Sequence, residues 1–405
     1  MASNNLDNNE LDPRLLARLA ANRTSRRRFL GGGSAAAAAL VLGPSFLAAC
    51  SSKESGGGGT TTSAAPADDG KPATGHLRIS NWPLYMADGF VAAFQTASGL
   101  TVDYKEDYND NEEWFAKNKE PLSRKQDIGA DLVVPTQFMA LRLKQLGWLN
   151  EISDTRVSNR KNLRPDLLND PSDPGRKYTA PYMTGMVGLA YNKAATGRPI
   201  TKIDDLWDPA FKGKVSLLSD TQDGLGMIMS SQGNSPEHPT MESVQKAVDL
   251  VKEQKAKGQI RRFTGNDYAD DLAAGNIVVA QAYSGDIVQL QADNPDLQFI
   301  IPESGGDWFI DTQVIPYTTQ NQHAAEAWIN YVYDRPNYAK LIAFTQYVPV
   351  LSDMEDELNK INPKLAANPL INPPQAIKDK LKTWPALSDE DTQAFNSAYA
   401  AVTGS

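Results

Sequence analysis

Five short runs of the chain bring acidic, hydroxyl and aromatic side chains within a few residues of one another. Four of them, residues 81–85, 136–138, 219–223 and 283–286, each follow an apolar stretch that is predicted to be a strand. The fifth, residues 305–311, combines aromatics with acids again. Ligands of open α/β sheets bind beyond the carboxyl ends of the strands. We therefore expect these runs to converge on one crevice.

Carboxylates and aromatic rings together suit a small organic cation. A buried ammonium group must meet a carboxylate, because an unpaired buried charge costs several kcal/mol. Aromatic faces suit methylenes and ammonium groups alike, and each cation–π contact contributes about 0.5–2 kcal/mol. A sugar would use the rings but not so many desolvated acids, and a phosphate or sulfate would be repelled. The pattern favours a flexible amine.

Motifs of catalysis are absent from the sequence. The histidines His76, His238 and His323 are isolated, and a solvated surface position is expected for each. No nucleophile elbow, phosphate-binding glycine loop or His/Cys metal cluster occurs, so no cofactor and no metal are expected. Two carboxylates alone could serve a glycosidase, but nothing marks such a pair. A binding protein, not an enzyme, is predicted.

The elements that must position these runs alternate between strands and helices. Apolar strands are predicted at residues 77–80, 131–134, 214–218 and 277–283, and a helix at 89–94. Strands this apolar, without polar alternation, are typical of sheets covered by helices on both faces. The fold class is therefore α/β.

The N-terminus predicts export. Arg26, Arg27 and Arg28 precede an apolar run that glycines and Pro44 interrupt, which is typical of a twin-arginine signal peptide over residues 1–49. Cys50, the only cysteine, follows Leu-Ala-Ala as in a lipoprotein cleavage site, so it is the expected lipidation position. Residues 50–75 are rich in Ser, Gly, Thr and Ala, which indicates a flexible, lipid-anchored linker.

Net charge agrees with a cationic ligand. The first 49 residues hold six arginines and three acids, so the remainder has 34 basic and 46 acidic residues. Its formal charge is −12, against −9 for the whole chain. Nucleic acid is disfavoured as a partner and a small cation is favoured.

From residue 77 to about 402 the chain resembles the bacterial spermidine/putrescine-binding proteins of ABC importers, within the extracellular solute-binding superfamily. The landmarks occur in the same order along the chain, at residues 80–85, 131–136, 181–185, 205–213, 271–275 and 283–286. The resemblance implies a two-lobed, type II periplasmic-binding-protein fold with two crossing segments, near residues 181–191 and 308–316. It implies one lobe of residues 76–185 plus 312–350 and another of 186–311 plus 351–405.

The resemblance also implies a ligand site. Its expected members are Trp82, Tyr85, Thr136, Phe138, Asp220, Asp223, Tyr283, Asp286, Trp308, Phe309, Asp311 and Tyr347. Asp311 is the expected charge anchor, with Asp286 as a second ammonium partner. The family ring aligns better with Phe309 than with Trp308. The acids at 220 and 223 are offset from the family pattern, and residues 183–184 replace a segment that often contains Trp.

Structural readings of the same residues remain open. Asp220 and Asp223 could stabilise a helix N-terminus, and Asp286 could cap the helix that follows it. Trp82 and Tyr85 could be ordinary core aromatics, and Asp311 could belong to a buried ion pair.

The resulting hypothesis is a monomeric lipoprotein, lipid-anchored on the outer face of the cytoplasmic membrane through Cys50. It would bind a polyamine and deliver it to an ABC permease powered by a cytoplasmic ATPase. The nearer alternative is the same fold binding another small solute, such as an amino acid, a sugar or another cation. The more distant alternative is an exported hydrolase that uses two carboxylates.

Overall fold

The computed structural model describes residues 71–404. The predicted signal peptide, Cys50 and nearly all of the predicted linker lie outside the described residues. Among those described, no helix is both long and apolar enough to cross a bilayer.

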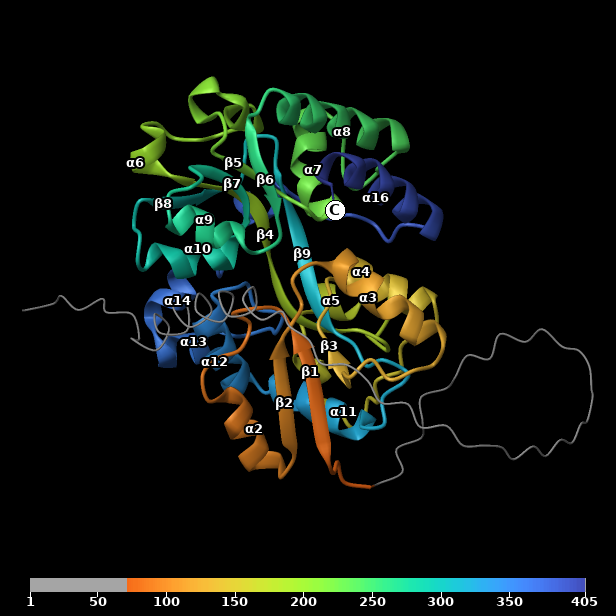
Figure 1. Cartoon of the computed structure of the whole chain (residues 1–405). Coiled ribbons are helices and arrows are strands. Elements are labelled where there is room, and N and C mark those ends of the chain that lie inside the picture. The colour runs from red at the N-terminus through yellow and green to blue at the C-terminus, as the bar shows by residue number, and fades with distance from the viewer. Residues whose placement is uncertain (1–70, 405) are drawn as a thin grey trace, which may run out of the picture. The chain divides into compact units, whose positions relative to one another are not determined.

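A small parallel sheet forms one side of the fold (Figure 1). Its strand order is β2-β1-β3, with β1 (His76–Asn81), β2 (Thr101–Glu106) and β3 (Leu132–Val133). β1 is the central strand, and it pairs in parallel with both neighbours. Helix α11, which comes from much later in the chain, packs against β1 and α2.

A larger mixed sheet forms the other side. Its path is β10-β9-β4-β7-β5-β6, and β8 also pairs with β4. The strands are β4 (Ala180–Asn192), β5 (Val215–Leu218), β6 (Ile260–Thr264), β7 (Val279–Tyr283), β8 (Leu297–Ile300), β9 (Gly306–Gln313) and β10 (Leu381–Lys382). Every residue of β5 is buried, as expected of a strand covered on both faces.

Helices cover the two sheets. The helices are α2 (Phe90–Ser98), α3 (Asn111–Ser123), α4 (Gln137–Gln145), α5 (Pro165–Leu168), α6 (Lys193–Thr196), α7 (Thr221–Ser231), α8 (Met241–Ala256), α9 (Tyr268–Ala273), α10 (Ser284–Gln291), α11 (Gln322–Val332), α12 (Arg335–Thr345), α13 (Glu355–Ile361), α14 (Pro363–Ala367), α15 (Gln375–Lys378) and α16 (Asp389–Thr403). Short 3₁₀ turns lie at Ser158–Asn162, Ile203–Trp207 and Pro209–Phe211. Helices α7, α8 and α16 pack on one another beside the larger sheet (Figure 1).

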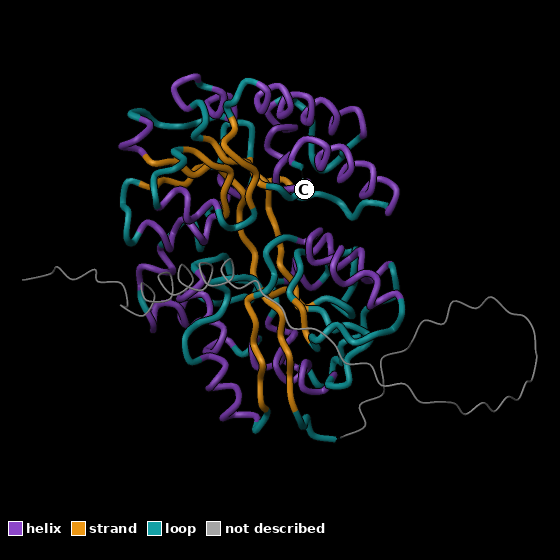
Figure 2. Tube along the Cα trace, viewed as in Figure 1, coloured by secondary structure: helices purple, strands orange, loops and turns teal. Residues whose placement is uncertain are grey.

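Strands β4 and β9 join the two sides of the fold. They are antiparallel partners, and both extend between the larger sheet and the smaller one (Figure 2), β9 running towards the smaller sheet and β4 away from it. Isolated bridges then link β3 to the chain after β9, at Val133 and Val314, and link Thr136 to Asp311. The two predicted crossing segments correspond to these strands. The α/β two-sheet fold predicted from the sequence is therefore confirmed, whereas the lobe boundaries remain a prediction.

Buried tyrosines attach the later helices to β4. Tyr338 on α12 donates a hydrogen bond to the carbonyl of Tyr182 at 2.7 Å and accepts one from the amide of Val350 at 3.1 Å. Tyr333 donates to the carbonyl of Pro181 at 2.8 Å. Buried backbone groups need such partners, because an unsatisfied one costs about 1–3 kcal/mol.

Replacement of Tyr338 by Phe should lower the free energy of unfolding by about 1–3 kcal/mol, because the amide of Val350 would lose its partner in a dry interior. Urea denaturation checks this. Tyr178→Phe is the matched control, since half-buried Tyr178 donates to Glu151 where water can substitute, and it should cost less. Equal losses in the two variants would contradict the assignment.

Candidate binding site

Buried acidic residues divide into two sets. Five of them form ion pairs with Arg or Lys: Asp131 with Arg78, Asp173 with Lys144, Asp205 with Arg198, Asp271 with Arg262, and Glu326 with Arg156. The other five are Asp220, Asp223, Asp286, Asp307 and Asp311. None of these five has an ion-pair partner among residues 71–404. A protein that can neutralise buried acids elsewhere leaves this group without a cation.

Asp311 is held by residues from the small-sheet side. It lies on β9 and is 3% exposed. The hydroxyl of Tyr85 donates to one of its oxygens at 2.7 Å, and that of Thr136 donates to the other at 2.8 Å. The interaction expected for Asp311 as a structural acid, a buried ion pair, does not occur among the described residues.

Asp286 has a similar environment on α10. Tyr347 donates to one oxygen at 2.7 Å, while Tyr268 and Asn266 donate to the other at 2.7 and 3.1 Å. Asp286 lies inside the first turn of α10, whose N-cap is Tyr283, and the N-cap side chain makes no hydrogen bond. The capping alternative for Asp286 is therefore not what the structure shows.

Asp220 and Asp223 lie at the N-terminus of α7. Asp220 caps this helix by accepting from the amide of Gln222 at 3.0 Å, so the capping interpretation holds for it. Its second oxygen faces the side-chain amide of Asn111 on α3, 3.3 Å away. Asp223 instead accepts from the hydroxyl of Tyr283 at 2.8 Å.

Burial raises the pKa of the unpaired acids. Desolvation raises the pKa of Asp311 to about 7, although its hydrogen bonds from Tyr85 and Thr136 oppose the rise. Desolvation likewise raises the pKa of Asp223 to about 6 and that of Asp286 above its ordinary value. For Asp131 burial acts in the same direction, but the hydrogen bonds from Arg78 and other donors lower its pKa overall. A cation placed among the unpaired acids would act as Arg78 does for Asp131.

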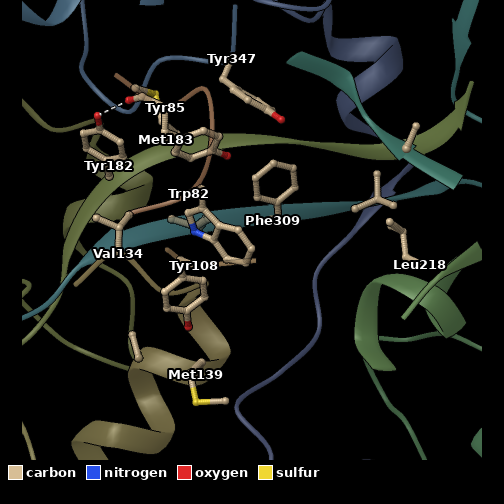
Figure 3. Packing of buried hydrophobic residues seen from close by; sticks show 14 of the residues in the cluster. Trp82, Tyr85, Tyr108, Val134, Met139, Tyr182, Met183, Leu218, Phe309 and Tyr347 are labelled. Atoms are coloured by element: carbon tan, nitrogen blue, oxygen red, sulfur yellow. Dashed lines mark hydrogen bonds between the residues drawn. The ribbon is translucent and has the colours of Figure 1, made fainter. Parts of the chain in front are cut away.

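Aromatic rings gather near these carboxylates, and Figure 3 shows Trp82, Tyr85, Tyr108, Phe309 and Tyr347 among them. Tyr347 contacts Tyr85 and Phe309, with ring centres 5.3 and 5.8 Å apart, and Tyr283 lies 5.3 Å from Phe309. Trp82 packs against Tyr108, with the ring centres 4.4 Å apart. The indole N–H of Trp82 is buried and has no hydrogen-bond partner in the described part of the chain.

The loop after β1 brings Trp82 and Tyr85 inward together. Leu84 between them adopts φ 61°, a left-handed conformation that costs a bulky residue about 1–2 kcal/mol. Both aromatics are buried. Strain of this kind persists only where the surrounding structure holds it in place.

A cavity of about 360 Å³ lies beside these groups. Thr136, Phe138, Asp223, Asp307 and Phe309 are among the residues that line it. Asp311 is not part of the lining, but it accepts a hydrogen bond from Thr136, which is. Trp308 also borders the cavity, but its side chain belongs to the opposite face of β9 from Phe309, because successive residues of a strand alternate. The guanidinium of Arg164 lies 5.8 Å from the Trp308 ring centre.

A second groove of about 820 Å³ leads to Asp220. Its lining includes Asp110, Glu112, Glu113 and Asp267, and no Lys or Arg. It lies between the start of α3 and the end of α16. All the charged side chains of its lining are therefore acidic.

Eleven of the twelve predicted site residues therefore lie within one connected region, and Trp308 borders its cavity but extends from the other face of β9. Sequence reasoning missed Asn111, Asn266, Tyr268 and the acid at 307. Asn266 and Tyr268 directly follow β6, so the same signal of polar and aromatic residues after a strand could have found them. Among the described residues, no group of three or more His, Cys, Asp or Glu side chains could hold a metal ion.

Comparison with known proteins identifies the class. The chain belongs to the bacterial extracellular solute-binding protein family, whose model matches residues 89–373. It is 29% identical over 306 residues to the spermidine/putrescine-binding periplasmic protein of Escherichia coli (strain K12), a match that covers 75% of this chain and 82% of that protein.

Solved structures share the fold. The TpPotD lipoprotein of Treponema pallidum has a TM-score of 0.69 at 22% identity, over 82% of this chain and all of that one. The binding protein AfuA of Actinobacillus pleuropneumoniae, solved with fructose-6-phosphate, has a TM-score of 0.62 at 18% identity, over 82% and 99%. This protein is thus an extracytoplasmic solute-binding component of an ABC transporter, and the hydrolase alternative is set aside.

The raised pKa of Asp311 makes stability depend on pH. The folded state keeps a proton on Asp311 up to about pH 7, whereas the unfolded chain loses it near the ordinary value of 3.8. The folded state therefore loses stability as pH rises between these values. Asp311→Asn, which cannot ionise, should gain stability relative to the unchanged protein as pH rises from about 4 to about 7, and the gain should stay constant above that. Urea denaturation of both ligand-free proteins measures the free energy of unfolding at each pH. A difference in this free energy that does not change with pH would contradict the prediction.

Proposed function

We propose that this protein binds a polyamine such as spermidine or putrescine for import. The observation that carries the proposal is the set of buried carboxylates without a cation, placed against aromatic rings. The ammonium groups of a polyamine would supply the missing positive charge. The methylenes between them would contact Tyr347, Phe309 and Tyr85. The spermidine/putrescine-binding relative supports the same ligand class.

The tyrosine hydroxyls prepare the carboxylates for such a ligand. Each hydroxyl donates to one carboxylate oxygen and fixes its direction, but it leaves the negative charge in place. Ammonium groups can then donate to the remaining acceptor sites of Asp311, Asp286 and Asp223. Charge-assisted hydrogen bonds of this kind are about twice as strong as neutral ones.

Lobe closure would couple capture to a change of conformation. Hydrogen bonds already cross between the two sides, from Ser219 to Asp110 at 3.2 Å and from Asn111 to Asp220 at 3.3 Å. The anchor Asp311 on β9 is itself bound by Tyr85 and Thr136 from the small-sheet side. A ligand that contacts residues of both sides binds the closed state more tightly than the open one. This difference in affinity shifts the population of molecules towards the closed state.

The remaining parts of the proposal concern delivery. The closed, loaded protein would dock on a membrane permease driven by a cytoplasmic ATPase. Cys50 would carry the lipid anchor after removal of a twin-arginine signal, and residues 50–75 would give the protein reach from the membrane. The lobes that close would be residues 76–185 plus 312–350 and residues 186–311 plus 351–405, acting as a monomer.

A second candidate is another solute on the same fold, since AfuA was solved with a sugar phosphate. A phosphate would meet Asp311, Asp286 and Asp223 at short range, and like charges repel strongly where water is excluded. The acids therefore disfavour an anionic ligand and leave other organic cations as the rival class.

Replacement of Asp311 by Asn should weaken both putrescine and spermidine binding by about thirtyfold or more, because an ammonium would lose its charged partner (a loss of about 2 kcal/mol or more). Isothermal titration calorimetry measures this. Glu303→Gln is the matched control, since Glu303 is an exposed acid near β9, and it should leave both affinities unchanged. Undiminished binding by Asp311→Asn, or no binding of either amine by the unchanged protein, would overturn the proposal.

A further inference from the structure

Asp307 is a buried acid of the cavity lining to which the proposed function assigns no ligand contact. It lies on β9, four residues before Asp311, and is 2% exposed. Neither of its carboxylate oxygens has a hydrogen-bond partner among the described residues. Asp311, Asp286, Asp223 and Asp220 each accept at least one.

An ionised Asp307 has no counter-charge among the described residues. Desolvation raises its pKa well above the ordinary value, and the charge of Asp223 adds to the rise. The backbone amide of Met227 lies near enough to oppose the rise, although it makes no well-aligned hydrogen bond to either oxygen. A buried polar group without a partner costs about 1–3 kcal/mol. A hydrogen-bond donor from a bound ligand would remove this cost at the Asp307 carboxylate.

Helix α7 leaves room for this carboxylate. A Cβ atom on Gly226 would lie 2.1 Å from one oxygen of Asp307 and 2.7 Å from the other. Only glycine at position 226 allows the carboxylate to take this place without displacement. The acid and the glycine thus fit each other across the interface between β9 and α7.

The position of Asp307 on β9 relates it to the proposed ligand. Asp307, Phe309 and Asp311 share one face of the strand, because alternate residues do. Opposite them in the register are Val187, Gly185 and Met183. At about 3.3 Å per residue, the two acids are about 13 Å apart along the strand, with the Phe309 ring between them. Asp307, Phe309 and Asp223 line the same cavity.

That spacing matches a triamine better than a diamine. With bonds near 1.5 Å, the terminal nitrogens of an extended four-methylene diamine are about 6 Å apart, and those of spermidine are about 11 Å apart. A diamine anchored at Asp311 would end near Phe309 and Asp223. A triamine would continue towards Asp307.

We propose that Asp307 is a further ligand anchor, which receives the distal ammonium of a triamine whose other end is held at Asp311, so that the carboxylate–ring–carboxylate face of β9 selects ligand length. This inference rests on the proposed polyamine function and deepens it. Three positive charges would then meet Asp311, Asp223 and Asp307, of which Asp223 and Asp307 line the cavity.

Calorimetric titration of the mature-length protein with spermidine and putrescine tests the inference. In Asp307→Asn, the preference for spermidine over putrescine should fall at least tenfold relative to the unchanged protein. Asp311→Asn should weaken both amines together, and Glu303→Gln should change neither. An unchanged preference in Asp307→Asn would overturn the role of Asp307 while leaving the polyamine function intact.

A second variant tests the same inference independently, in case Asp307→Asn does not fold. Gly226→Ala keeps every acid but displaces the Asp307 carboxylate through the added Cβ atom. It should reduce the spermidine preference in the same direction, with urea denaturation confirming that it is folded. A retained preference in folded Gly226→Ala would count against the inference. If the unchanged protein binds neither amine, the proposed function fails and this inference fails with it.

Discussion

Five buried carboxylates, those of Asp220, Asp223, Asp286, Asp307 and Asp311, have no counter-charge among the described residues. Desolvation makes each of these carboxylates costly to ionise, which is visible in the raised pKa values of Asp223 and Asp311. Arginine would remove that cost, as Arg78 does for Asp131. Tyrosine and threonine hydroxyls orient the acids without neutralising them. A bound cation would then neutralise the carboxylates that have no Arg or Lys partner.

The geometry of that interior is set by β4 and β9. These two strands belong to the larger sheet, yet their ends reach the smaller one, so Asp311 can accept hydrogen bonds from Tyr85 and Thr136. Glycine at 185 lets the Phe309 and Tyr347 rings approach β4, because a Cβ atom there would lie 2.6 Å from Phe309. Rings and carboxylates consequently lie close together where segments distant in sequence meet.

Much of this was predictable, because strand ends in an α/β sheet place their loops at a common edge. The exceptions have physical causes. Trp308 and Phe309 are adjacent in sequence, and only the pairing of β9 with β4 decides that Phe309 lies beside Tyr283. Tyr268 and Asn266 were missed because β6 has exposed arginines at 261 and 262 and lacks the continuous apolar run of a buried strand. Asp220 proved to be a helix cap that also faces Asn111.

Local composition and periodicity were enough to establish the α/β class, the excess of acidic residues after residue 49 and the residue types available for a cation. These depend on local composition and periodicity, which need no knowledge of partners distant in the chain. Which acids have counter-charges and which do not became known only from the folded arrangement. That division depends on long-range neighbours such as Arg78 for Asp131, Tyr347 for Asp286 and Gly226 for Asp307. Pairing across such separations is a property of the packed fold, not of any segment within it.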